Sequence, residues 1–156
     1  MAWHGSEEQD KKMEFTTAVK EDLPKIIELY RQLNMSNDNL TTEKINEVWG
    51  IIEKNNIRYF VAKENNEVIG SCYVAIIPNL TFNGKSIGYI ENVITDAQHR
   101  RKGIGRKLME MAINYAKKQN CYKVVLQSGI KRTDAHKFYE SIGFNGESKK
   151  AFELRF

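Results

Sequence analysis

The residues best suited to chemistry are two glycines and five cations in the string QHRRKGIGRKLM at positions 98–109. Gly103 and Gly105 stand where a strand is expected to pass into a helix. A helix start leaves about four backbone N–H groups without partners and carries roughly +0.5 charge, so an anion is stabilised there. Glycine has no Cβ and lets a ligand approach the backbone. This stretch therefore predicts a polyphosphate site.

The charge distribution narrows the kind of ligand. The chain carries 24 Lys+Arg against 20 Asp+Glu, a formal charge of +4. Residues 97–109 hold five cations and no acid, so subtracting these five from +4 leaves −1 for the rest of the chain. A nucleic-acid binder spreads its cations along a face or stripe. We therefore expect no nucleic-acid partner. A solvated cation run is the alternative interpretation, and the interleaved glycines favour the site.

Length and composition indicate one ordinary domain, because 156 residues with 41% hydrophobic content can bury a single core. Cys72 and Cys121 are far apart and form neither a disulfide framework nor a metal-ligand set, which favours a cytoplasmic protein without a metal. No apolar run approaches 18 residues, so we expect no membrane association. Residues 1–12 are polar and aperiodic, which predicts a tail or a vector-derived remnant before a domain over residues 13–156.

Hydrophobic periodicity indicates which elements position the glycine-bearing loop. Strands are predicted at residues 15–19, 58–63, 68–77, 86–95, 122–127 and 147–156. Helices are predicted at residues 21–33, 41–54, 103–119 and 131–142. The order β-α-α-β-β-β-α-β-α-β predicts an α/β domain with a mixed central sheet and helices on both faces.

The spacing of the glycines excludes two common phosphate loops. A P-loop requires Gly-x-x-x-x-Gly-Lys-Ser/Thr, which is absent from the sequence. The dinucleotide fingerprint requires a third glycine at position 108, which is Leu108. What remains is Arg100-x-x-Gly103-x-Gly105.

This remaining spacing resembles the acetyl-coenzyme A signature of the GCN5-related N-acetyltransferase (GNAT) superfamily. The string YIENVITD at 89–96 is similar to the strand that precedes the loop in that family. The string DAHKFYESIGF at 134–144 is similar to its Ala-x-x-Phe-Tyr-x-x-x-Gly-Phe motif. The three motifs follow in order within residues 14–156. The resemblance implies a GNAT-like fold, acetyl-CoA as co-substrate, and acetyl transfer to an amine.

The resemblance also implies which residues bind the coenzyme. The strand would hold the pantetheine arm through main chain, and the N–H of Val93 or Ile94 would polarise the acetyl carbonyl. The pyrophosphate would lie on main-chain N–H groups of the loop. Lys107, Lys131 and Arg132 are candidates for a 3′-phosphate contact, although the family often has Asn at position 132. The coenzyme-binding set is Val93, Ile94, Thr95, Arg100, Arg101, Lys102, Gly103, Ile104, Gly105, Arg106 and Arg132.

Two side chains are candidates for proton transfer. Tyr139 has a phenol of ordinary pKa about 10 that can protonate a departing thiolate. Phe138-Tyr139 alone favours an aromatic core pair, and the resemblance reverses this interpretation in favour of the general acid. Glu91 interrupts an apolar strand, where an unpaired charge is costly. It is either the base that deprotonates the amine or the partner of a salt bridge, for example to Arg58. His136 is expected to be a surface or packing residue.

The acceptor is the open part of the prediction. The resemblance places it near Tyr30, Arg31, Trp49, Arg58 and Phe152, as a small-molecule or peptide amine. Ile90-Glu91-Asn92 is similar to the amino-sugar-phosphate branch, with amino acids, polyamines, aminoglycosides and protein termini as alternatives. A non-catalytic acetyl-CoA-binding sensor is the alternative function, and a homodimer is left open.

Overall fold

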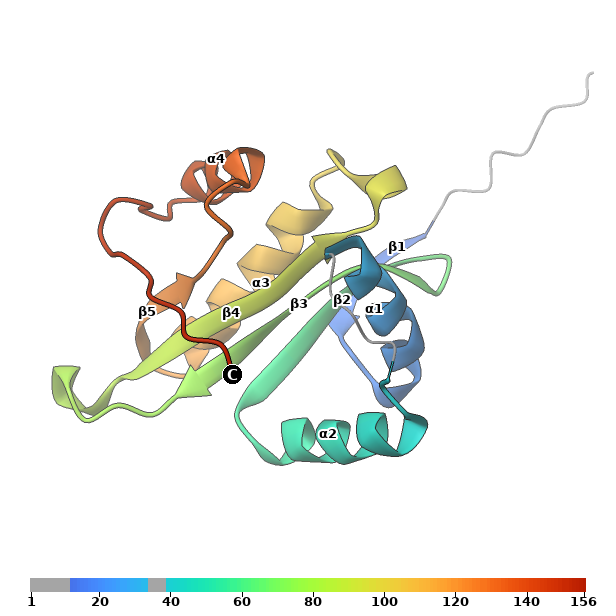
Figure 1. The fold of residues 1–156 in the computed structure, drawn as a ribbon, viewed down its shortest axis with the longest axis horizontal. Helices are drawn as coiled ribbons and strands as arrows, with labels where there is room; N and C mark the ends of the chain where they lie inside the picture. The colour runs from blue at the N-terminus through green and yellow to red at the C-terminus, as the bar shows by residue number, and fades with distance from the viewer. Residues whose placement is uncertain (1–11, 34–38) are drawn as a thin grey trace, which may run out of the picture.

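The computed structural model describes residues 12–33 and 39–156 and arranges them around one central sheet (Figure 1). The predicted tail over residues 1–12 lies outside the described residues, except for Lys12. The main elements in chain order are β1 (Met13–Thr17), α1 (Leu23–Tyr30), α2 (Thr42–Lys54), β2 (Ile57–Glu64), β3 (Glu67–Ile77), β4 (Ser86–Thr95), α3 (Ile104–Lys118), β5 (Cys121–Leu126) and α4 (Thr133–Ser141).

The five strands lie in the order β1-β2-β3-β4-β5. The first four pair antiparallel, and β5 pairs parallel to β4 after the crossover through α3. The strands predicted at residues 58–63 and 68–77 are confirmed as β2 and β3, and they form an antiparallel hairpin. Its turn residues Asn65 and Asn66 have φ of 50° and 69°, the left-handed backbone that a two-residue hairpin turn requires.

Helices pack on both faces of this sheet, as predicted (Figure 1). On one face α3 presents a stripe of four fully buried residues to the strands, and α4 packs beside it. The stripe consists of Leu108, Met109, Ala112 and Ala116. On the other face α1 and α2 bury Ile26, Leu29 and Trp49 against β2 and β3. The expected mixed α/β fold is therefore confirmed.

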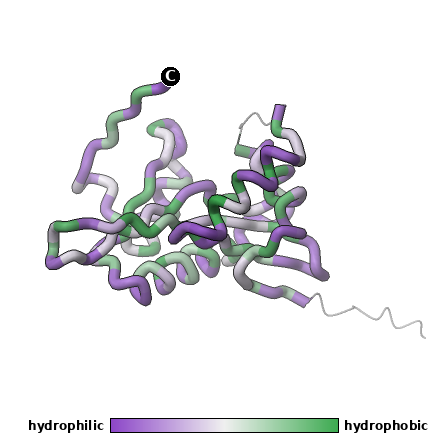
Figure 2. The backbone as a smooth tube through the Cα atoms, turned by 90° about the horizontal axis from the view of Figure 1, so that it is seen from below, coloured by the Kyte–Doolittle hydropathy of each residue, from purple (hydrophilic) through white to green (hydrophobic). Residues whose placement is uncertain are grey.

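The predicted last strand, residues 147–156, is wrong, because this segment has no regular structure. Apolar and polar residues alternate over its last five positions, 152–156 (Figure 2), which is the pattern of a strand with one buried face. A strand also needs a neighbour for its backbone, and β5 pairs only with β4 among the described residues. Phe152 and Leu154 are consequently 84% and 80% exposed. The segment instead passes over the open end of the β4–β5 pair (Figure 1).

Candidate active site

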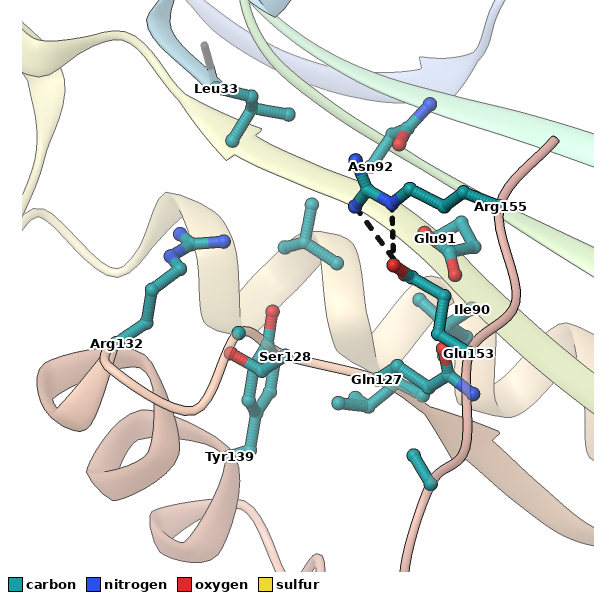
Figure 3. Close-up of a pocket in the computed structure, with 14 residues that line it drawn as sticks. Leu33, Ile90, Glu91, Asn92, Gln127, Ser128, Arg132, Tyr139, Glu153 and Arg155 are labelled. Atoms are coloured by element: carbon teal, nitrogen blue, oxygen red, sulfur yellow. Dashed lines mark hydrogen bonds and ion pairs between the residues drawn. The ribbon is translucent and has the colours of Figure 1, made fainter. Parts of the chain in front are cut away.

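A cavity opens where β4 and β5 separate. Their pairing runs from Ser86–Cys121 to Ile90–Leu126 and goes no further. Beyond this point a cavity of about 460 Å³ lies between the strands (Figure 3). It is lined by Leu33, Ile90, Glu91, Asn92, Val93, Leu126, Gln127, Ser128, Gly129, Arg132, Tyr139, Ala151, Glu153 and Arg155.

A β-bulge in β4 shapes one wall of this cavity. Asn92 has φ of 51°, and Asn92 and Val93 together lie opposite Cys72, without a partner residue of their own in β3 or β5. The extra residue inverts the alternation of the strand. Ile90 therefore packs toward α3, whereas Ile94 packs toward α1. Regular alternation would place Glu91 and Asn92 on opposite faces, and the bulge lets both line the cavity.

The glycine-bearing loop has the backbone of an anion site. Gly103 is the residue before α3 and has φ of 78°, and Arg101 has φ of 63°. The first backbone bond of the helix is from Lys107 N to Gly103 O at 3.1 Å. Among the described residues, the N–H groups of 104, 105 and 106 have no carbonyl partner. These three donors are available to phosphate oxygens.

The side chains of the loop differ in what they can offer to a ligand. Arg100, Arg101 and Lys102 are exposed, and the Nε of Arg100 donates to Thr95 O at 3.3 Å. Arg106 is exposed but directs its guanidinium to Ser141 Oγ at 3.1 Å in α4. Ile104 is 3% exposed and belongs to the core, so only its backbone can contact a coenzyme. Their roles in coenzyme binding stay predictions.

A short brace holds this loop in place. In the 3₁₀ turn Ala97–His99, Asp96 accepts from Gln98 N at 2.9 Å and from Gln32 Nε2 at 3.0 Å. The ring of His99 lies between Asp96 Oδ1 at 3.2 Å and Glu64 Oε2 at 3.1 Å. These contacts join the 3₁₀ turn after α1 and the end of β2 to the start of the glycine-bearing loop.

Tyr139 is a core residue that also lines the cavity. Its ring packs against Phe138 and Phe144, with centroids at 5.3 and 6.1 Å, and only 9% of the residue is exposed. Its hydroxyl nevertheless reaches the cavity (Figure 3). Burial raises the pKa of this phenol above its ordinary value, opposed by nearby Arg132, so it keeps its proton at neutral pH.

Glu91 lines the same cavity from the opposite wall (Figure 3). It lies near Tyr73 and Tyr89, two phenols on the α1 side of the sheet. Burial first, and then proximity to other phenols and to the Glu91 carboxylate, raises the pKa of Tyr73 to about 12. The alternative of a salt bridge to Arg58 is wrong, because the Arg58 guanidinium lies 5.4 Å above the ring of Tyr115 in α3, across the sheet.

Of the five expected acceptor residues, only Tyr30 and Trp49 lie side by side. Arg58 lies on the α3 face, and Trp49 is 6% exposed in the core beneath α1 and α2. Tyr30 is half-buried beside Trp49, while Arg31 and Phe152 are exposed. None of the five lines the cavity at the end of β4 and β5.

Several cavity residues were not anticipated from the sequence. Gln127 and Ser128 directly follow β5, and residues after parallel strands commonly border ligands, which is a signal that could have found them. Glu153 and Arg155 belong to the segment predicted as a strand, and Leu33 ends a 3₁₀ turn after α1. His136 is not among the residues that line the cavity. Its Nε2 lies 2.9 Å from Gly129 O and holds the loop after β5, consistent with a packing role.

Within the described residues, no cluster of three or more His, Cys, Asp or Glu side chains is arranged to hold a metal ion. Nor does this part of the chain contain a helix with the length and apolar character to span a membrane.

The fold and the loop define an acetyltransferase of the GNAT class. The acetyltransferase (GNAT) family model matches residues 18–144, so the chain belongs to this family, whose acetyl donor is acetyl-CoA. The family resemblance and the predicted co-substrate are thereby confirmed.

Two solved structures and one further relative are similar to this chain. A putative acetyltransferase from Agrobacterium tumefaciens is 37% identical with a TM-score of 0.85, over 92% of this chain and 99% of that one. A predicted acetyltransferase from Clostridium acetobutylicum, solved with acetyl-CoA, has a TM-score of 0.75 at 24% identity, over 92% of this chain and 96% of that one. Glucosamine 6-phosphate N-acetyltransferase of Trypanosoma brucei brucei is 31% identical over 101 residues. These residues are 65% of this chain and 64% of the relative.

Proposed function

We propose that this protein transfers the acetyl group of acetyl-CoA directly to a primary amine. The observation that carries the proposal is the meeting of Tyr139 and Glu91 in one cavity at the gap between β4 and β5. The phosphate loop begins at the carboxyl end of β4, and it offers three N–H donors to the far end of the same co-substrate.

The residues divide the reaction into three tasks. Glu91 takes a proton from the acceptor ammonium, directly or through water, which gives nitrogen the lone pair it needs. The backbone N–H of Val93, in the bulge, donates to the acetyl oxygen as negative charge develops there. Tyr139 gives its proton to the sulfur as the carbon–sulfur bond breaks. The second proton that the nitrogen loses restores the Tyr139 phenol, and the products are an amide and a free thiol.

The acceptor side of the cavity supports a small polar amine. Asn92, Gln127, Glu153 and Arg155 supply amide, carboxylate and guanidinium groups there. The trypanosomal relative is named for an amino-sugar phosphate, and it shares 31% of residues over the aligned part. An amino-sugar phosphate is accordingly the first acceptor to test, followed by amino acids, polyamines and peptide N-termini.

Two measurements in sequence test the proposal. Acetyl-CoA at about 100 times its dissociation constant should stabilise the fold by roughly 2.7 kcal/mol. For a domain of this size that is a rise in unfolding temperature of about 5 to 11 °C. Thiol release is then measured across the amine panel. A temperature rise with no turnover would instead identify a coenzyme-binding sensor, and no rise would contradict both functions.

The cytoplasm is the compartment we propose for this activity. Cys72 and Cys121 are both free thiols. Reduced cysteines are usual where glutathione and thioredoxin keep thiols reduced.

A further inference from the structure

Ser128 is placed at the centre of the wall from which Tyr139 enters the cavity. It follows β5 by two residues, where that strand has left β4. Figure 3 shows Ser128 and Tyr139 on the same side of the cavity. The loop beyond Ser128 is held by two contacts to Gly129 O, from Arg132 N at 2.9 Å and from the His136 ring at 2.9 Å. The position of Ser128 is thus fixed by its surroundings.

The Ser128 hydroxyl is a buried polar group that the fold leaves unused. Its Oγ is shielded from solvent and has no hydrogen-bond partner among the described residues. Buried hydroxyls in proteins nearly always have a partner, and those without one commonly serve a ligand or a reaction. A serine hydroxyl can donate one hydrogen bond and accept two. Because Ser128 lines the cavity, the missing partner is expected to arrive with the substrate.

The position of Ser128 indicates which part of the co-substrate that partner is. No residue of the 100–106 loop is among the described residues that line this cavity, so the pyrophosphate end lies elsewhere. Tyr139 and Val93, the groups assigned to the departing sulfur and the acetyl oxygen, both line it. Ser128 therefore faces the reacting end.

We propose that Ser128 is a second hydrogen-bond donor to the coenzyme sulfur, acting beside Tyr139 while the sulfur carries negative charge. The inference rests on the proposed function for its reacting groups. When the carbon–sulfur bond breaks, the sulfur keeps the electron pair and receives the proton of Tyr139. Ser128 keeps its own proton and stabilises the anion through the hydrogen bond. Thiolates gain more from such donors than neutral thiols or thioesters do.

The test uses free coenzyme A, whose bound thiol can be titrated through the ultraviolet absorbance of its thiolate. Ser128→Ala should raise the pKa of the bound thiol relative to wild type, because a donor to the thiolate is lost. Ser128→Thr keeps the hydroxyl and should restore it. Ser148→Ala, which removes an exposed serine hydroxyl outside the cavity, is the matched control and should leave the thiol pKa unchanged.

Turnover gives a second, independent readout. With the best amine, Ser128→Ala should lower kcat by about 10- to 100-fold, the range for a hydrogen bond to a charged group. The unfolding temperature should not fall, because the hydroxyl has no partner in the fold. An unchanged thiol pKa in Ser128→Ala would overturn the proposal, and so would a strong loss of stability, which would make Ser128 structural.

The same measurements distinguish failure of the proposed acetyl transfer from failure of the role proposed for Ser128. If no amine is acetylated but coenzyme A binds, the thiol titration still decides the role of Ser128. If coenzyme A does not bind to wild type, both proposals are overturned.

Discussion

Replacing Tyr139 by phenylalanine removes one oxygen from the cavity and leaves the packing in place. The ring contacts with Phe138 and Phe144, at 5.3 and 6.1 Å, do not involve the hydroxyl. A positioned general acid contributes about 10²- to 10⁴-fold in rate. At about 1.4 kcal/mol per factor of ten, the loss of transition-state stabilisation is about 3 to 5 kcal/mol. Tyr139→Phe should therefore lower kcat by that factor.

The affinity and stability of Tyr139→Phe distinguish a general acid from a residue that only packs in the core. The affinity for acetyl-CoA should change little, and the free energy of unfolding should stay within about 1 kcal/mol, because no protein partner of the hydroxyl is lost. Burial raises the pKa of the phenol, so wild-type activity should not decline through loss of this proton below about pH 10.

The assay is thiol release at saturating acetyl-CoA and amine, with Tyr122→Phe as the matched control. Tyr122 stacks on Phe82 at 4.1 Å, outside the cavity, and its hydroxyl should be dispensable. If Tyr139→Phe turns over within about threefold of wild type, the phenol is not the general acid. Tyr139 would then be a packing residue only.

Four further changes test other parts of the account. Gly105→Val should raise the dissociation constant of acetyl-CoA by about tenfold or more, measured by calorimetry, because a side chain at this position would obstruct the approach of a phosphate to the N–H groups of 104–106; an unchanged constant would contradict the assignment of the loop. Glu91→Gln should lower kcat by about 10²-fold and remove the decline of rate at low pH, and an unaltered pH–rate profile would exclude it as the base. Gly88→Ala should destabilise by about 1 to 3 kcal/mol in urea unfolding, since a Cβ there would lie 3.0 Å from Ala116 Cβ; stability equal to wild type would contradict this packing. Burial would raise the pKa of Asp96, but hydrogen bonds to its carboxylate outweigh burial and lower this pKa. The contribution of the Asp96 carboxylate to the free energy of unfolding is complete above an ordinary pKa of about 3.9 and is lost as pH falls below it. Asp96→Asn should therefore lose less stability on acidification than wild type.

The parts of the site that depend on main chain were predictable from the sequence. Gly103 and Gly105 mark a strand-to-helix loop by their spacing alone, and Gly103 does take a left-handed conformation, with φ of 78°. The element order up to α4 follows from periodicity, because each helix has one apolar stripe.

The face on which a side chain lies was harder to predict. Both faces of β2 are covered by helices, so Tyr59 and Phe60 are both large aromatic residues and give no sign of which faces α3. Arg58 was consequently assigned to the acceptor side and lies on the other. The bulge at Asn92 is similarly invisible in the string IENVIT, because it depends on how β4 registers against Cys72 in β3.

The final segment shows the limit of periodicity itself. Residues 152–156 alternate as a strand would, yet strand formation depends on a neighbouring backbone that the local sequence cannot specify. Ser128 was overlooked for a related reason. A serine after a strand is ordinary in sequence, and only the burial of its hydroxyl without a partner makes it notable.

The most direct test of the central claim is a count of free thiol released from acetyl-CoA by wild-type protein across a panel of primary amines. At least one amine, beginning with amino-sugar phosphates, should give thiol and acetylated amine in equal amounts, with the rate lost in Tyr139→Phe. If acetyl-CoA stabilises the fold while no amine in the panel releases thiol, the protein binds the co-substrate without using it, and the account of Tyr139 and Glu91 as catalytic groups is contradicted.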